Sequence, residues 1–242
     1  MTIHLLLSSV ILLLITNGAS SQESNDFRPL FNGKNLDGWE IKAKPADVKK
    51  HFWKVEDNMI VVNSTGISDH DYVWLMTENE YTNFELRLKF AAYKSSSGNS
   101  GIQIRSRYDN ENYWLDGPQI DIHPPLPWRT GFMWDETRDV KRWIYPDIPK
   151  GEWVNEEMRE IVVPMKFSDG NENWNDLIII AKENSIKAWL NETLITNFNS
   201  AKILNDEFHL KYNVGKTGHI CLQLHTGDEL FMKFKDIFIK PL

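Results

Sequence analysis

The chain has 242 residues, a net charge of -7, ten tryptophans and a single cysteine. Acidic and basic residues are mixed along the sequence without a basic stripe, which argues against a nucleic-acid partner. An internal disulfide is excluded, so the fold must rely on its core, and Cys221 is expected to be buried and inert.

The first segment is an apolar run from Leu5 to Ile15, followed by small and polar residues as far as Ser21. A run of this length is too short to span a bilayer and is typical of a secretory signal. We therefore expect residues 1–21 to be a signal peptide and residues 22–242 to form a single domain. The protein would be exported to the periplasm or the extracellular space without membrane insertion.

Apolar and polar residues alternate over most of the remaining chain, as in β-strands with one buried face. Only Asp206 to Lys211 has a weak helical period. Many short strands without a long amphipathic helix predict an all-β, two-sheet sandwich. The expected strands are Phe52–Val55, Met59–Val62, Val73–Met76, Phe84–Phe90, Gly101–Arg105, Trp114–Ile122, Glu160–Val163, Leu177–Ala181, Ser185–Leu190, Thr193–Asn197, Gly218–Leu224 and Phe231–Ile239.

Turns and one irregularity can be predicted between these strands. Asparagine tolerates the left-handed conformation of tight turns, and a slip in apolar phase near Asp236 predicts a β-bulge. The expected hairpin turns are Asp57-Asn58, Glu183-Asn184 and Asn191-Glu192.

The strand that ends at His123 carries the first candidate site. Residues two apart on a strand share a face, about 6.6–6.8 Å from each other, so Gln119, Asp121 and His123 are expected on one side. Ile120 and Ile122 then point into the core. An amide, a carboxylate and an imidazole would line one surface.

A long loop from Pro124 to Trp153 follows, and ordered loops of this length usually shape a binding site. Trp128, Arg129 and Trp134 are its candidate contacts to a sugar, because flat aromatic faces suit sugar rings. We expect one further strand inside the loop, over Arg142 to Tyr145.

The same parity argument extends to two further strands, whose polar residues would converge with the first group if the strands are neighbours in the sheet. If Ile102, Ile104, Leu222 and Leu224 face the core, the polar residues between them face away from it. The residues added to the candidate surface in this way are Gln103, Arg105, Gln223 and His225.

Several motifs together resemble one known family. They are Leu30-Phe31-Asn32-Gly33-Lys34-Asn35-Leu36-Asp37-Gly38-Trp39, Gly98-Asn99-Ser100-Gly101-Ile102, Trp174-Asn175-Asp176, Ile186-Lys187-Ala188-Trp189-Leu190-Asn191 and Gly218-His219-Ile220-Cys221-Leu222-Gln223-Leu224-His225. In this order they resemble the 3-keto-disaccharide hydrolase family. The resemblance implies a concanavalin A-like or laminin-G-like jelly-roll sandwich that acts on a carbohydrate.

The resemblance implies cleavage of glycosidic bonds in 3-keto-glycosides or disaccharides by elimination and hydration, which needs a base, a cation and an acid. We assign His123, oriented by Asp121, as the base, Arg105 as the cation for the enolate and His225 as the acid. Gln103, Gln119 and Gln223 would hold hydroxyl groups. No cofactor is assigned, although Asp121, His123 and His225 also suit a divalent metal.

Alternatives remain open at this point. An ordinary glycosidase needs two carboxyl groups, and Asp135 or Glu136 would have to join Asp121. A non-catalytic carbohydrate-binding module needs only the cleft and its tryptophans. A structural or protein-interaction domain of the laminin-G type would bind no sugar.

Overall fold

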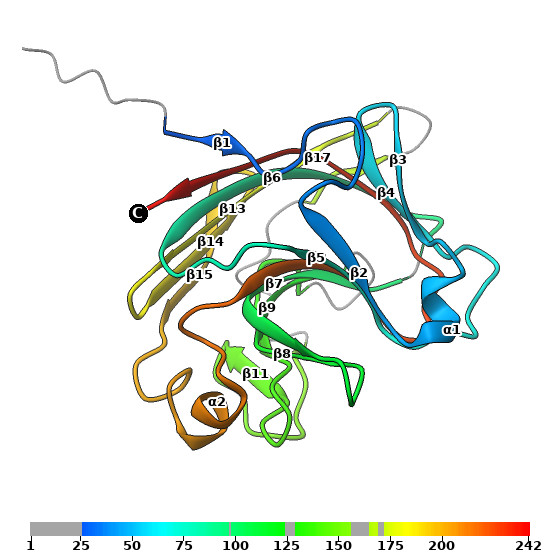
Figure 1. Cartoon of the computed structure of the whole chain (residues 1–242). Coiled ribbons are helices and arrows are strands. Elements are labelled where there is room, and N and C mark those ends of the chain that lie inside the picture. The colour runs from blue at the N-terminus through cyan, green and yellow to red at the C-terminus, as the bar shows by residue number, and fades with distance from the viewer. Residues whose placement is uncertain (1–25, 97, 124–128, 156–164, 169–171) are drawn as a thin grey trace, which may run out of the picture.

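The computed structural model describes residues 26–96, 98–123, 129–155, 165–168 and 172–242. Within them, two sheets stack as two layers, and short segments and two short helices close the ends (Figure 1). The expected signal peptide and the expected strand over 160–163 lie outside the described residues. No helix in the described ranges has the length and apolar character needed to cross a membrane.

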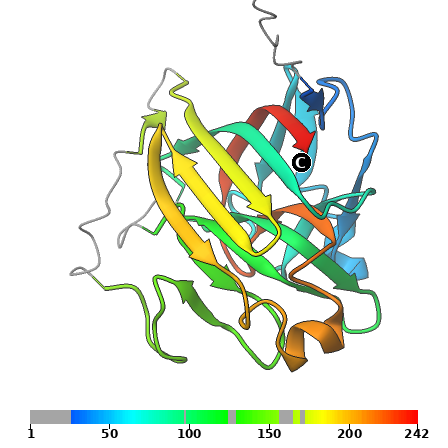
Figure 2. The ribbon, with the colours of Figure 1, turned by 90° about the vertical axis from the view of Figure 1, so that its left-hand side faces the viewer.

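We call the first layer sheet I. Its strands are β1 (Arg28–Pro29), β3 (Trp53–Glu56), β4 (Met59–Asn63), β6 (Phe84–Tyr93), β12 (Phe167–Ser168), β13 (Asn175–Lys182), β14 (Ser185–Leu190), β15 (Thr193–Asn199) and β17 (Phe231–Pro241). Its order is β15-β14-β13-β6-β17-β4-β3, with β1 on β17 and β12 on β6. The hairpin strands β13, β14 and β15 lie side by side in Figure 2.

Sheet II is the second layer and carries the candidate site. Its strands are β2 (Trp39–Lys42), β5 (Val73–Thr77), β7 (Ser100–Asp109), β8 (Trp114–Asp116), β9 (Pro118–Ile122), β10 (Met133–Asp135), β11 (Arg142–Tyr145) and β16 (His219–Leu224). The order is β11-β10-β9-β7-β16-β5-β2, and β8 pairs with β7. The helices are α1 (Pro45–Val48) and α2 (Glu207–Tyr212).

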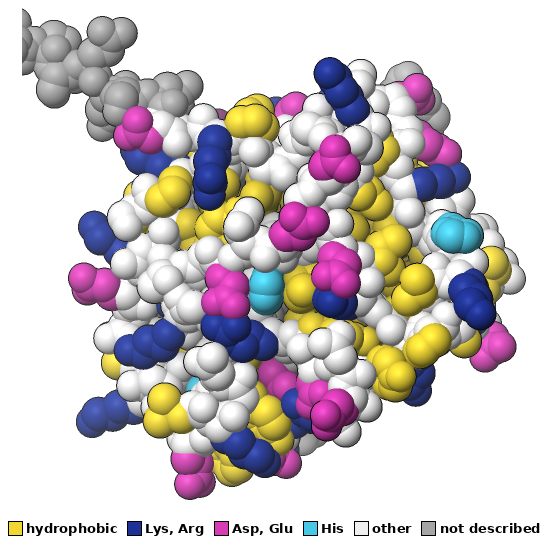
Figure 3. Space-filling view, in the orientation of Figure 1, with side chains coloured by type: hydrophobic (Ala, Val, Ile, Leu, Met, Phe, Trp, Pro, Cys, Tyr) yellow, Lys and Arg dark blue, Asp and Glu magenta, His cyan; other side chains and the backbone are white. Residues whose placement is uncertain are grey.

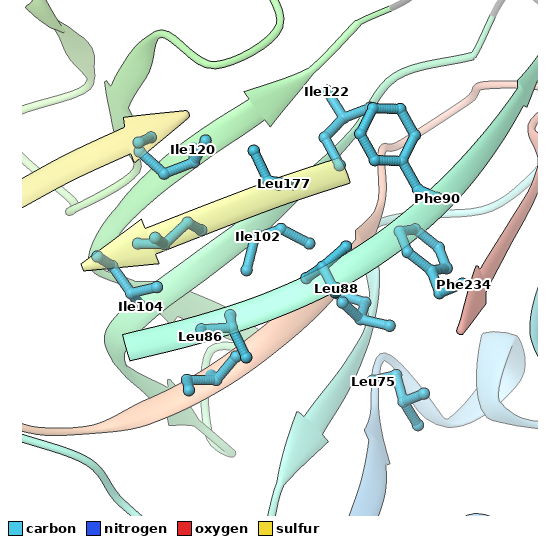
Figure 4. Packing of buried hydrophobic residues seen from close by; sticks show 14 of the residues in the cluster. Leu75, Leu86, Leu88, Phe90, Ile102, Ile104, Ile120, Ile122, Leu177 and Phe234 are labelled. Carbon is cyan, nitrogen blue, oxygen red and sulfur yellow. The ribbon is translucent and has the colours of Figure 1, made fainter. Parts of the chain in front are cut away.

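The core lies between the two sheets and follows from the period of two. Ile102, Ile104, Ile120 and Ile122 of sheet II are fully buried against leucine and phenylalanine side chains of sheet I (Figure 4). Because one face of β9 is buried in this way, Gln119 and Asp121 must point to the opposite face of sheet II.

The all-β sandwich is confirmed, and so are the three hairpin turns. Asp57, Glu183 and Asn191 all have positive φ. The predicted bulge is also present, since the register of β17 on β6 shifts between Lys235 and Phe238. The predicted strand from Trp114 to Ile122 is instead two strands, because Gly117 breaks it with a φ of 132°.

A second bulge, which the sequence did not predict, lies in β7. Cys221 of β16 pairs with Gln103, but His219, two residues earlier, pairs with Ser106, so β7 carries one extra residue. Arg105 occupies this bulge with a φ of 50°. A bulge of this kind ends the alternation of faces along the strand.

Charged side chains of both signs are interspersed over the face shown in Figure 3. This distribution agrees with the mixed charge pattern of the sequence.

We expect Leu86→Ala to lower the free energy of unfolding by about 2–5 kcal/mol, because it opens a cavity between the sheets. Leu86 is 0% exposed. Urea denaturation measures the loss, with Leu210→Ala in α2, whose side chain is largely exposed, as the matched control. Equal losses in the two variants would contradict this account of the core.

Candidate functional site

A pocket of about 160 Å³ lies on the face of sheet II opposite the buried isoleucines. It combines carboxyl groups, amides, cations and aromatic rings, as binding sites for polar ligands do. Its lining residues are Tyr72, Asn99, Gln119, Asp121, Arg129, Trp134, Glu136, Lys141, Trp143, Trp153 and His225.

Asp121 is fixed in the pocket wall by two donors. Gln119 Nε2 donates to Asp121 Oδ1 at 3.0 Å, and Arg129 Nε donates to Asp121 Oδ2 at 2.8 Å. Gly101 of β7 pairs with Asp121 in the sheet, and a Cβ at Gly101 would overlap the side chain of Gln119. The glycine therefore leaves the space in which Gln119 reaches Asp121.

Glu136 follows β10 and is the carboxyl group with the most altered acidity in the pocket. Its side chain is buried, and this burial raises the pKa of Glu136 to about 7, although Lys141, His225 and a hydrogen bond from Trp134 act in the opposite direction. A carboxyl group whose pKa lies near 7 can either accept or deliver a proton at physiological pH.

His225 directly follows β16 and connects the pocket to Asp228, a carboxylate that does not line the pocket. Its Nε2 lies 3.1 Å from the Tyr72 hydroxyl, and its Nδ1 lies 3.4 Å from Asp228 Oδ2. Burial lowers the pKa of His225, but the hydrogen bond and charge of Asp228, with the charges of Glu136 and Asp121, outweigh burial and raise it. These charges therefore favour the protonated form of the imidazole.

Three lining groups are buried polar atoms that find no hydrogen-bond partner among the described residues: Asn99 Oδ1, Gln119 Oε1 and Trp143 Nε1. Leaving such atoms unpaired costs about 1–3 kcal/mol each. Their position in the pocket wall makes them natural partners for the hydroxyl groups of a ligand.

An interlocked group of three indoles forms one side of the pocket. Trp134 and Trp153 stack with ring centroids 5.5 Å apart and an angle of 8°, and Trp143 meets both edge-on. The Arg129 guanidinium lies 5.8 Å from the ring centroids of both Trp143 and Trp153. The same arginine therefore links the indoles to Asp121.

A buried ion pair supports β10 from behind. Asp135 lies between Trp134 and Glu136 in sequence, points to the other face, and accepts from His209 Nε2 at 2.9 Å. His209 Nδ1 lies 2.7 Å from Asp206, the N-cap of α2. Burial lowers the pKa of His209, but the two carboxylates outweigh the effect of burial and raise this pKa. Helix α2 is thereby tied to the strand that carries the pocket residues.

Five predicted site residues meet in the pocket, namely Gln119, Asp121, Arg129, Trp134 and His225. Gln103 and Gln223 lie on the predicted face but are fully buried and do not line the pocket. His123 does not line it either, although its charge contributes to the low pKa of Asp228. Trp128 lies outside the described residues.

The assignment of Arg105 as a substrate clamp is wrong. Its side chain is 1% exposed and donates to the carbonyl oxygens of Thr82 at 2.8 Å and Glu183 at 2.9 Å. The bulge in β7 turns Arg105 away from the face of Gln103, so the parity argument holds at Gln103 and fails two residues later. Arg105 holds together chain segments at the end of the sandwich.

Among the described residues, no group of three or more His, Cys, Asp or Glu side chains is arranged to hold a metal ion. Asp121, His123 and His225 therefore do not form the metal site that their residue types suggested.

The parity argument missed several lining residues, because they come from loops or from other strands. The sequence suggests Glu136 only as a second carboxyl group for a glycosidase, although its position two residues after Trp134 already indicates a side chain on the same face. The missed residues are Tyr72, Asn99, Lys141, Trp143 and Trp153.

An antiparallel jelly roll with a carboxyl- and indole-lined pocket on one sheet face is typical of carbohydrate-related proteins. The chain belongs to the family of 3-keto-alpha-glucoside-1,2-lyase-like domains, which it matches over residues 26–240. This match confirms the family resemblance seen in the sequence. No curated protein sequence matches the chain significantly.

Solved structures of low sequence identity share the fold. One is a candidate glycosyl hydrolase from Parabacteroides distasonis, with 20% identity and a TM-score of 0.56 over 90% of this chain and 94% of that one. Another is the carbohydrate-binding module CBM66 from Bacillus subtilis, with 10% identity and a TM-score of 0.52 over 84% and 95%. A third is a Bacillus subtilis protein of unknown function with a galectin-like fold, with 7% identity and a TM-score of 0.54 over 88% and 94%.

We expect Arg105→Ala to lower the free energy of unfolding by about 2–4 kcal/mol, because the buried carbonyl oxygens lose their donors. The affinity of the pocket for a sugar should stay within about twofold of the wild type, since Arg105 does not line it. Thermal unfolding and calorimetric titration measure the two effects, and Arg87→Ala on an exposed face is the matched control. If the variant is as stable as the wild type but has lost its affinity for the sugar, Arg105 contributes to binding and the structural role assigned to it is wrong.

The raised pKa of Glu136 also predicts that the stability of the protein depends on pH. Between its ordinary value of 4.5 and about 7, the unfolded chain releases the proton that the folded protein keeps, so the free energy of unfolding falls as pH rises. Glu136→Gln should remove up to about 3 kcal/mol of this fall between pH 4.5 and pH 7.5. Urea denaturation across this range, with the exposed Glu56→Gln as control, tests the sign, and an unchanged slope would contradict it.

Proposed function

We propose that this protein cleaves the glycosidic bond of 3-keto-glycosides or 3-keto-disaccharides by elimination, followed by addition of water. The observation that carries the proposal is Glu136, a buried carboxyl group with a pKa of about 7 that shares its pocket with His225, Arg129 and Lys141. Membership in the family of 3-keto-alpha-glucoside-1,2-lyase-like domains supports the same chemistry.

The reaction needs only proton transfers and stabilisation of negative charge. A ketone at C3 acidifies the proton on C2, so a base removes it and the electron pair of the C–H bond forms an enolate. The enolate collapses to a C1–C2 double bond, the C1–O bond breaks, and the leaving oxygen takes a proton from an acid. Water then adds its hydroxyl group to C1 and a proton to C2, which yields the free 3-keto sugar.

Glu136 suits the role of the base, because its pKa of about 7 combines a substantial ionised fraction with real basicity. Its position also differs from that of Asp121, whose two oxygens already accept from Gln119 and Arg129. In this proposal Asp121 positions Arg129, and Glu136 replaces His123 as the base.

His225 suits the role of the acid for the leaving oxygen, since the neighbouring carboxylates outweigh burial and raise its pKa, which favours the protonated imidazole. Tyr72 and Asp228 orient its ring through the two nitrogens. Arg129 and Lys141 supply positive charge for the enolate oxygen, and Asn99 and Gln119 offer their unpaired oxygens to sugar hydroxyls.

We extend the proposal to where the protein works. The apolar run from Leu5 to Ile15 favours export, so the substrate would be met outside the cytoplasm.

A non-catalytic carbohydrate-binding module is the second candidate. The unpaired amide oxygens and the exposed indole of Trp153 favour it, because they serve sugar binding without any acid or base. The two functions differ in what the protein does with a sugar oxidised at C3.

The deciding experiment offers glucosides and disaccharides with and without prior oxidation at C3 and measures release of free sugar. We expect turnover only of the oxidised sugars. Glu136→Gln should lower kcat by about 10²–10⁴-fold while sugar affinity persists, and the exposed Glu56→Gln should behave as wild type.

Two results would count against the proposed reaction. Saturable binding of sugars without turnover would establish the binding module instead. Full turnover by the Glu136→Gln variant would remove Glu136 from the role of the base.

A further inference from the structure

Trp153 is a large apolar side chain left in solvent at the edge of the pocket. It is 60% exposed, although it also lines the pocket with Trp134 and Trp143. Among the large hydrophobic side chains that are exposed in the described residues, it is the only tryptophan. An exposed indole beside a polar pocket is a common place for contact with a ligand.

The indole is held in place rather than free to turn. One face stacks on Trp134 at 5.5 Å, Trp143 meets it edge-on at 6.4 Å, and the Arg129 guanidinium lies 5.8 Å from its centroid. These contacts fix the ring before a ligand arrives, so binding to it costs little conformational entropy.

The size of the pocket indicates what must reach Trp153. Sites that enclose a drug-sized ligand span about 300–1,000 Å³, whereas this pocket measures about 160 Å³. It therefore has room for the ring that reacts beside Glu136 and His225, but not for a second ring. Whatever is attached through the glycosidic oxygen must extend past the rim.

We propose that Trp153 binds the leaving group of the substrate, and that this group is a ring with a flat apolar face. A pyranose of a disaccharide and an aromatic aglycone share this chemistry, because each can stack on an indole. The identification of this ring as the leaving group rests on the proposed function. The contact itself requires only that a glycoside occupies the pocket.

The experiment compares three C3-oxidised substrates, namely a methyl glucoside, a disaccharide and an aryl glucoside. For Trp153→Ala we expect the loss of kcat/KM on the substrates with a second ring to exceed the loss on the methyl glucoside about tenfold. Trp153→Phe, which keeps an aromatic face, should recover most of the loss. Trp189→Ala on sheet I is the matched control and should change none of the values.

The pattern of losses also identifies the ring. A loss confined to the disaccharide assigns the subsite to a pyranose, and a loss confined to the aryl glucoside assigns it to an aromatic aglycone. Equal losses on all three substrates, or no loss on any, would overturn the inference. Thermal unfolding of each variant shows whether a general loss comes from misfolding.

A binding measurement separates this inference from the proposed reaction. Calorimetric titration with the unoxidised disaccharide, aryl glucoside and methyl glucoside needs no turnover. If no substrate is cleaved but Trp153→Ala still weakens binding of a two-ring ligand about tenfold relative to the methyl glucoside, the reaction is wrong and the subsite stands. If the wild type binds no two-ring ligand more tightly than the methyl glucoside, the subsite is wrong.

Discussion

The pairing of β7 with β9 is the constraint from which the pocket follows. Ile102 lies opposite Ile120 and Gly101 opposite Asp121, so one face of both strands closes the core while the other presents Gln119 and Asp121. A slip of one residue would bury the carboxylate and expose the isoleucines, which the core does not allow. The hydrophobic packing between the sheets thereby sets the position of the polar groups on the far side.

On that far side, neighbouring groups alter the acidity of one another. Burial raises the pKa of Glu136 to about 7, whereas at His225 burial lowers the pKa but Asp228 and the pocket carboxylates outweigh it and raise the pKa. Arg129 neutralises Asp121 directly at 2.8 Å. The pocket therefore holds a carboxyl group and an imidazole whose pKa values are both raised, for different reasons. In the proposed reaction these two groups serve as base and acid.

The sequence was most informative where the strands are regular. Alternation predicted the sandwich and the shared face of Gln119 and Asp121, because these depend only on a period of two, and the asparagine-containing pairs between the apolar runs predicted the turns. It failed at Arg105, where an unpaired extra residue changes the face, and no local signal marks that bulge. Glu136 and Trp153 lie in the long loop predicted from Pro124 to Trp153. They line the same pocket as His225 because of long-range strand pairing, which periodicity does not encode.

The ion pair between His209 and Asp135 bears on how this scaffold could be redesigned. A graft that replaced residues 206–212 with a foreign loop would remove His209 and leave the Asp135 carboxylate buried without a counterion, directly between Trp134 and Glu136. An orphaned buried charge is far more harmful than the loss of the whole pair. Loop exchange at this end of the sandwich must therefore carry a histidine with it, or replace Asp135 in the same step.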